Sequence, residues 1–281
     1  MSLTINSNLA SLAGQTQLSK TQKSIQQSLA ELGSGQASVN AANQAISQQL
    51  QAQINGNNQA LNNTNDGVSL VQTADSALGQ LQSNTQQIQT LAIQAGDGAL
   101  SGSNRQALQQ QVDQLTQANS QIVQSAQYNG TPLLTGGNAT TFQVGPNGTS
   151  SNQLTVPGIN LSAAPASGGL NSYNANLAAT NTIDITTQAN ALTAQQSAQN
   201  DLNAIGAQRT TLGAVNNSFN SVVDNLQTSN ISTQAANSRI SDADYAAASA
   251  QLASQQILGQ SAALAQRQAN IAPQAALSLL G

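Results

Sequence analysis

The chain has 281 residues and a formal net charge of -4, and it contains no His, no Cys and no Trp. Charged residues make up 6% of it, whereas they make up roughly 25% of ordinary globular proteins. Without Cys and His, the chain lacks disulfides, thiol nucleophiles and the commonest zinc ligands and general bases. Six Lys and Arg residues cannot form a basic surface for nucleic acid. No apolar run is long enough to cross a membrane. We therefore expect no cofactor, no metal, no enzymatic activity, no nucleic acid partner and no membrane partner.

The first residues carry neither a basic segment nor a continuous apolar segment. They are therefore not expected to be a cleaved secretory signal, which leaves a cytoplasmic protein or export by a route without such a signal. The richness in Gln and Asn could by itself indicate disorder. Apolar periodicity continues through the Gln-rich stretches, however, and favours helices with amide surfaces.

The two ends of the chain carry matching apolar patterns on two predicted helices. Residues 3–33 are expected to form the first helix, which Gly33-Ser34-Gly35 ends. Its apolar residues are Leu9, Leu12, Leu18, Ile25, Leu29 and Leu32, of which Leu18, Ile25 and Leu32 are seven apart. The last helix carries Leu252, Ile257, Leu258, Leu264, Ile271, Leu277 and Leu280, of which Ile257, Leu264 and Ile271 are seven apart. Such spacing is typical of helices that pack lengthwise on other helices.

One helix cannot bury an apolar stripe alone, and two helices side by side still leave apolar surface uncovered. We therefore expect the termini to pair with each other and to contact neighbouring copies through these residues. An intramolecular coiled coil would explain the spacing alone. It would not explain why 3–18 and 246–266 contain no charged residue, since ordinary coiled coils carry Glu and Lys beside the seam. Polymer contact is the favoured interpretation.

Three more helices are predicted between the ends, at about 41–95, 104–128 and from about 185. The third is expected to be interrupted at 230–241. Their apolar positions recur on one face and predict a helical core: Val68, Leu78, Leu81, Ile88, Leu108, Leu115, Ile122, Ile205, Leu212, Phe219 and Leu226. The charged residues of this part are expected to be exposed: Arg105, Asp113, Asp201 and Arg209.

The stretch at about 135–175 differs from the rest. Thr141-Phe142-Gln143-Val144 and Leu154-Thr155-Val156 predict two short strands, and Gly145-Pro146-Asn147-Gly148 predicts a turn between them. The element order is nearly symmetrical about this stretch. It predicts a mainly α fold, namely a long antiparallel helical rod or coiled coil with a small β-hairpin element and paired terminal helices. The expected domains are 1–40 with 241–281, and 41–240, with the β element beside or beyond the far end of the helices.

Asp242 and Asp244 precede the last helix. Two carboxylates without a third ligand are a weak signal for a metal, and acidic residues here cap a helix and complement its dipole. We expect them to act as caps. Arg239 is expected to pair with one of them and to set the angle between the helices.

Five stretches, in this order and at this spacing, are similar to segments of one protein family: Asn65–Leu78, Gln127–Gly130, Leu212–Val215, Ser238–Tyr245 and Leu277–Leu280. On these motifs the chain resembles the bacterial flagellins over essentially its whole length. The resemblance implies a structural subunit that polymerises into the flagellar filament for motility. The alternatives are the hook–filament junction protein of the flagellum and a flagellin-like surface adhesin.

The resemblance also implies the partners and the location. These are further copies of the chain, the flagellar export apparatus, a chaperone that masks the C-terminal helix, and the filament cap and hook-associated proteins. The expected location is extracellular, in a flagellum, after export without a cleaved signal.

Two departures from the family pattern concern receptors that recognise flagellins. The segment 35–43 is neutral and short, and Gln87 and Gln111 replace an Arg and a Glu that many flagellins present to an animal Toll-like receptor. Gln87 and Gln111 thus form a receptor face without charge, and we expect the Toll-like receptor to recognise this chain weakly. The low charge itself has two open explanations, which are adaptation to an acidic habitat and compositional drift toward Gln and Asn.

Overall fold

The computed structural model describes residues 8–38 and 40–280, with side chains up to Ile271. The helices are α1 Leu9–Ser34, α2 Ala41–Ala95, α3 Gly102–Ser125, α4 Gln188–Ser241 and α5 Tyr245–Leu280. The strands are β1 Gln127–Tyr128, β2 Thr131–Pro132, β3 Thr140–Gln143 and β4 Gln153–Val156, and short 3-10 turns lie at Ser150–Asn152 and Pro165–Ser167. The predicted mainly α fold with paired terminal helices and a small β element is confirmed.

The chain divides into two compact units, Met1–Ile54 with Ile231–Gly281, and Asn55–Asn230. These boundaries lie inside α2 and α4. The sequence instead placed the domain boundaries at the helix breaks near residues 40 and 241.

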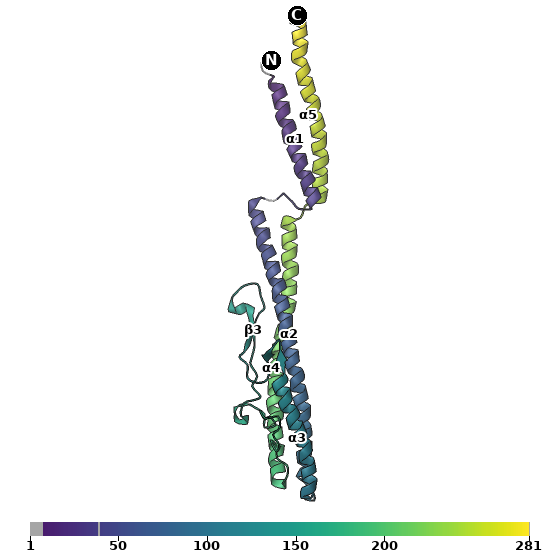
Figure 1. The fold of residues 1–281 in the computed structure, drawn as a ribbon. Coiled ribbons are helices and arrows are strands. Elements are labelled where there is room, and N and C mark those ends of the chain that lie inside the picture. The colour runs from purple at the N-terminus through teal and green to yellow at the C-terminus, as the bar shows by residue number, and fades with distance from the viewer. Residues whose placement is uncertain (1–7, 39, 281) are drawn as a thin grey trace. The chain divides into compact units, whose positions relative to one another are not determined.

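In the first unit, α1 and α5 lie side by side and antiparallel (Figure 1). Near one end, the Asn8 side-chain amide donates to Ala269 O at 2.9 Å. Near the other end, Ser28 Oγ donates to Gln255 Oε1 at 3.3 Å. Helix α1 begins where the Asn8 side chain accepts from Ser11 N–H, and it ends at Gly35, whose φ of 69° is readily adopted by glycine.

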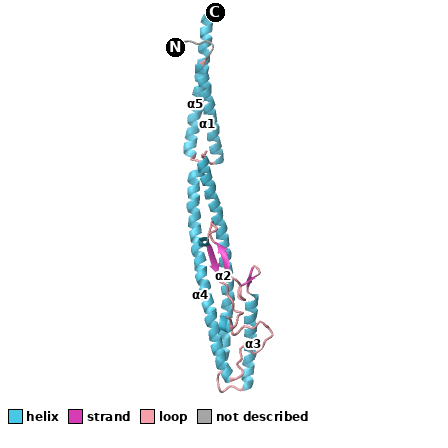
Figure 2. Ribbon diagram, turned by 90° about the vertical axis from the view of Figure 1, so that its left-hand side faces the viewer, coloured by secondary structure: helices cyan, strands magenta, loops and turns pink. Residues whose placement is uncertain are grey.

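In the second unit, α2, α3 and α4 lie alongside one another (Figures 1 and 2). Amide side chains join these helices: Asn84 to Asn119 between α2 and α3, and Gln89 to Gln199 between α2 and α4. The apolar series predicted from the sequence faces inward here. Leu78, Leu81, Ile88, Ile205, Leu212, Phe219 and Leu226 are buried, and Val68, Leu108, Leu115 and Ile122 are partly buried against the same cores.

The β element packs beside the helices of this unit rather than beyond their end (Figure 2). Strands β3 and β4 pair antiparallel, with Phe142 opposite Leu154. Phe142 meets Phe219 of α4 edge-on, with ring centroids 5.6 Å apart. The Asn63 side chain of α2 donates to Gln143 O at 3.0 Å. The β element therefore contributes to the same core as the helices.

Two boundaries differ from prediction. The expected break at 230–241 is absent, and α4 is helical up to Ser241. Apolar periodicity fades there, but the stretch contains neither Gly nor Pro, so nothing in it opposes the helix. Helix α3 ends at Ser125 rather than 128, because Asn129 and Gly130 adopt positive φ values of 48° and 77° and form a tight hairpin between β1 and β2.

Gly67 of α2 lies against the ring of Phe219. A Cβ atom at this position would lie 2.4 Å from Phe219 Cζ, and the ring is completely buried. Glycine within a helix costs about 1 kcal/mol relative to Ala. The close approach of the ring explains why a glycine stands here.

We predict that Gly67→Ala lowers the free energy of unfolding by about 1–2 kcal/mol, because overpacking outweighs the gain in helix propensity. Gly79→Ala is the matched control in the same helix, since no neighbouring side chain or element lies within 4 Å of a Cβ there. The control should raise stability by up to about 1 kcal/mol. Urea unfolding followed by circular dichroism measures both variants, and equal stabilisation by the two would contradict the prediction.

Candidate interaction surface

The fully buried positions in the seam between α1 and α5 are occupied by small side chains. Thr21, Ser28 and Ala248 are its buried residues. Gly14 lies against Gln266, and Gly259 lies against Thr21, each with about van der Waals spacing for an added Cβ. Small residues at these positions let the two helices approach closely.

The predicted apolar residues of the termini divide into two groups in the structure. Leu18, Ile25, Leu32 and Leu252 are half-buried, and the first three follow the α1 face that carries Thr21 and Ser28. The second group is exposed and consists of Leu9, Leu12, Leu29, Ile257, Leu258, Leu264 and Ile271. The side chains of Leu277 and Leu280 lie outside the described residues.

The seven-residue series of α5 faces away from α1. Ile257, Leu264 and Ile271 are 64%, 65% and 54% exposed. At 100° per residue, Ile257 and Leu264 lie on the side of the helix opposite Gly259 and Ala248, which face α1. Helix α5 therefore has one face of small residues that packs in the unit and a second, apolar face that the unit leaves uncovered. We call Ile257, Leu264 and Ile271 the outer stripe.

The breaks between the helices in the first unit are hydrogen-bonded to each other. Ala37 N–H donates to Ser241 O at 2.9 Å, and Ala243 N–H donates to Gly35 O at 3.0 Å. The Tyr245 hydroxyl donates to Leu32 O at 3.2 Å, at the last turn of α1. Sequence reasoning missed this junction, because paired backbone groups in short breaks leave no pattern of side chains.

The predicted caps behave differently from one another. Asp244 accepts from Ala246 N–H and Ala247 N–H, each at 3.0 Å, and thus caps the start of α5. Asp242 instead accepts from the hydroxyls of Ser238 and Ser241 at the end of α4.

The expected pairing of Arg239 with a carboxylate is wrong in this structure. Its guanidinium donates to Ala235 O at 3.1 Å, one turn back along α4. A side chain that reaches the carbonyls at a helix C-terminus is favoured by the helix dipole, which explains this choice of partner.

Of the four charged residues that were predicted to be exposed, Arg105, Asp113 and Arg209 are half-buried. Asp201 is completely buried. Arg105 donates to Ala95 O, the last carbonyl of α2, and to Asp97 O and Leu100 O in the turn that follows, at 2.7–2.8 Å. Sequence gives no signal for this, because each partner is a backbone group or comes from a distant segment.

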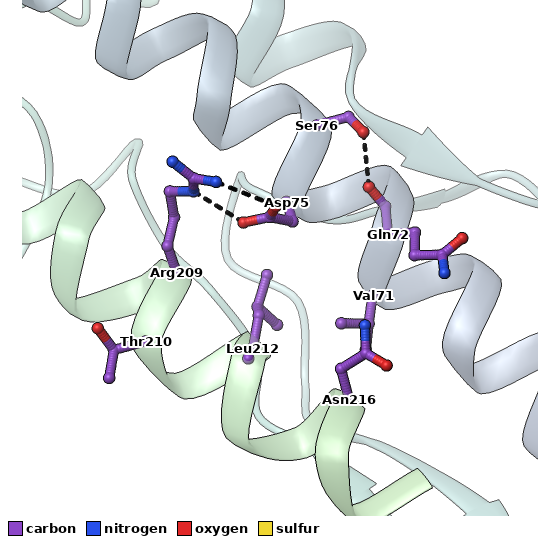
Figure 3. A pocket seen from close by; sticks show the side chains of 9 residues that line it. Val71, Gln72, Asp75, Ser76, Arg209, Thr210, Leu212 and Asn216 are labelled. Carbon is purple, nitrogen blue, oxygen red and sulfur yellow. Dashed lines mark hydrogen bonds and ion pairs between the residues drawn. The ribbon is translucent and has the colours of Figure 1, made fainter. Parts of the chain in front are cut away.

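Arg209 and Asp75 form the one ion pair among the described residues, at 2.8 Å between α4 and α2. The hydrogen bond to Asp75 and the charge of this carboxylate raise the pKa of Arg209, and burial opposes them slightly. The pair borders a shallow hollow that also contains Val71, Ser76 and Leu212 (Figure 3). The carboxylate is engaged by the guanidinium, so the hollow presents no free acid or base for catalysis.

Gln87 and Gln111 are both exposed and border one groove between α2 and α3, whose other lining residues include Leu91 and Leu115. Within the described part of the chain, no group of three or more acidic residues could hold a metal, and no helix is long and apolar enough to span a membrane.

Comparisons with known proteins agree with these features. Residues 5–139 match the model of the bacterial flagellin N-terminal helical region, and residues 192–280 match the model of the C-terminal helical region. Flagellin of Halalkalibacterium halodurans is 33% identical over 98% of this chain and 99% of its own length. Flagellin of Bacillus subtilis is 30% identical over the same shares. The flagellar filament 33 kDa core protein of Treponema phagedenis is 32% identical, again over 98% and 99%. The chain therefore belongs to the bacterial flagellins, the structural subunits of the extracellular flagellar filament.

Proposed function

We propose that the chain polymerises into the flagellar filament through the outer stripe of α5 and the exposed apolar residues of α1. The single observation that carries this proposal is the orientation of the outer stripe. Three large apolar side chains, seven residues apart, lie in a row on the face of α5 opposite α1. Such a row is the packing face of a helix that has a helical neighbour.

The outer stripe is large enough for its burial against another molecule to stabilise a contact. Burying one Leu or Ile side chain contributes about 1.5–3 kcal/mol, so covering the outer stripe contributes several kcal/mol per copy. Helix α5 has no charged residue between Ala246 and Gln266. Over most of the stripe, a partner can therefore pack against the helix without removing a charged side chain from water. A second copy of the same chain supplies a matching face at every position of a regular polymer.

The names of the relatives favour a filament subunit over the hook–filament junction protein or an adhesin, since they are called flagellins or a filament core protein. We further propose that the chain is not an enzyme. The absence of His and Cys and the engaged state of the Asp75 and Asp201 carboxylates support this.

The remaining partners are proposed from family membership. They are the flagellar export apparatus, a chaperone on the C-terminal helix, and the cap and hook-associated proteins. Export without a cleaved signal belongs to the same proposal, and the uncharged apolar stripe of α5 is a surface that would need masking before assembly.

We predict that a triple substitution of the outer stripe, Ile257→Gln, Leu264→Gln and Ile271→Gln, abolishes polymerisation and leaves a soluble monomer. The reason is that the stripe loses its apolar area while the seam with α1 is untouched. Elongation from wild-type filament seeds, followed by light scattering and electron microscopy, measures the effect.

The matched control replaces exposed apolar residues outside the stripe, Ile93→Gln and Leu192→Gln, both 59% exposed in the wild-type chain. The control should elongate at close to the wild-type rate. Elongation of the triple variant at the wild-type rate would overturn the assignment of the polymer contact.

We also predict weak signalling through the flagellin-sensing Toll-like receptor, because the neutral amides of Gln87 and Gln111 cannot make charge-assisted hydrogen bonds. Restoring the charges with Gln87→Arg and Gln111→Glu should raise signalling in a reporter-cell assay. The control places the same charges one residue earlier on each helix, Gln86→Arg and Gln110→Glu, outside the groove. Strong signalling by the unmodified chain would refute the prediction.

A further inference from the structure

Three Asn residues in this chain are followed by Gly, at Asn55-Gly56, Asn129-Gly130 and Asn147-Gly148. An Asn before Gly is chemically labile, because the following backbone nitrogen can attack the side-chain amide and glycine has no side chain to hinder the approach. All three Asn side chains are exposed. Exposure therefore does not distinguish the three sites, and the backbone at each site decides how readily the reaction occurs.

Regular structure protects two of the three sites. Asn55 and Gly56 lie within α2, where the attacking N–H is engaged by the carbonyl four residues earlier. Asn129 and Gly130 form the turn between β1 and β2, with φ values of 48° and 77°. Ring closure at Asn129 would require rotation of a backbone that the strand pairing on both sides holds in place.

Asn147 and Gly148 lie in the loop between β3 and β4, outside any helix or strand. Among the residues that the structure describes, no acceptor bonds the Gly148 N–H. No atom beyond its chain neighbours lies within 4 Å of the position of a Cβ at Gly148. The attacking nitrogen is therefore neither bonded nor crowded.

The start of this loop is held by contacts with a strand and a helix. Pro146 packs against Gly56 of α2, where an added Cβ would lie 2.9 Å from Pro146 Cβ. The side-chain amide nitrogen of Gln143 donates to Gly145 O at 2.9 Å and to Asn147 O at 2.5 Å. The second bond bears on the chemistry, because Asn147 O and Gly148 N belong to the same peptide group.

We propose that Asn147 is a site of spontaneous deamidation, and that the hydrogen bond from Gln143 activates it. A hydrogen bond donated to a peptide carbonyl stabilises the negative charge that the peptide acquires when its N–H loses a proton. The nitrogen that loses this proton, Gly148 N, is the nucleophile. Gln143 therefore favours formation of the nucleophile at this site.

The reaction consumes only water. After its proton passes to solvent, Gly148 N bonds to the side-chain carbonyl carbon Cγ of Asn147. The bond between Cγ and Nδ2 breaks, and Nδ2 takes up a proton from solvent and leaves as ammonia. Water then opens the cyclic imide at either of its carbonyls, which gives aspartate or its β-linked isomer. The net change is the replacement of a neutral amide by a carboxylate.

The product changes both the charge and the backbone of the loop. Either isomer adds a negative charge to a chain whose formal net charge is -4. The β-linked isomer also adds a carbon to the backbone directly after Pro146, the residue that packs against Gly56. The chain thus acquires a mark of its age at this loop without an enzyme.

The test incubates the folded full-length chain in mildly alkaline buffer, with a second sample in urea, before digestion with pepsin in acid. Liquid chromatography with mass spectrometry separates the Asn, Asp and β-linked forms of each peptide. In the folded chain, Asn147 should convert several-fold faster than Asn129 and Asn55. In urea the three sites should convert at similar rates, because the structure no longer distinguishes them. Conversion of Asn147 no faster than that of Asn55 in the folded chain would overturn the proposal.

Substitution of Gln143 tests the activating bond. Gln143→Met keeps the length of the side chain but removes the donor, so it should slow the conversion of Asn147 several-fold in the folded chain and leave the rate in urea unchanged. The matched control is Gln153→Met on the opposite strand, which leaves both bonds donated by Gln143 in place and should keep the wild-type rate. Faster conversion in Gln143→Met would show that the bond restrains the loop, and would overturn the activating role.

Gly148→Ala tests the identity of the nucleophile. The loop has space for the added methyl group, which hinders the approach of the nitrogen to Cγ of Asn147. Conversion of Asn147 should slow several-fold while the circular dichroism spectrum stays unchanged. An unchanged rate in this variant would show that ammonia is lost without attack by this nitrogen, which contradicts the proposed reaction.

Discussion

The close seam between α1 and α5 is the constraint on which the rest of this structure depends. Because the seam combines small side chains such as Thr21, Ser28 and Gly259 with half-buried Leu and Ile residues, the two helices pack without using Ile257, Leu264 or Ile271 of α5. The outer stripe is therefore left over for another molecule. Pairing within one chain and assembly between chains use different faces of one helix, so neither competes with the other.

The second unit shows what replaces charge in a chain with so few ionisable residues. Helices that would ordinarily be joined by ion pairs are joined by amides and hydroxyls, as between Asn84 and Asn119. Asp75 serves the one described ion pair, while Asp113, Asp201 and Asp244 accept backbone N–H groups at loops and caps. Exposed ion pairs contribute little to stability, so their loss from the surface costs little. A carboxylate that orders a loop is harder to replace.

The sequence predicted the helices well, since α2 begins at Ala41 and ends at Ala95 as expected. Long apolar periodicity with Gly at its ends is a local sequence signal for a helix. The turn residues Gly145-Pro146 between two short apolar runs are likewise a local signal for the two strands. The sequence could not predict which face of α5 turns toward α1, because small residues such as Gly259 carry no apolar signal. The buried state of Asp201 was missed for a related reason. Its partners are backbone groups about thirty residues away, and no local pattern marks them.

The most direct test of the account is amide hydrogen exchange, measured by mass spectrometry on the same chain as monomer and as filament. The account predicts that peptides covering the outer stripe, residues 250–271, become strongly protected only in the filament. Peptides from the buried part of α2 around Leu78 and Leu81 should be protected in both states. Equal protection of residues 250–271 in monomer and filament would show that the outer stripe is not what neighbouring copies bury.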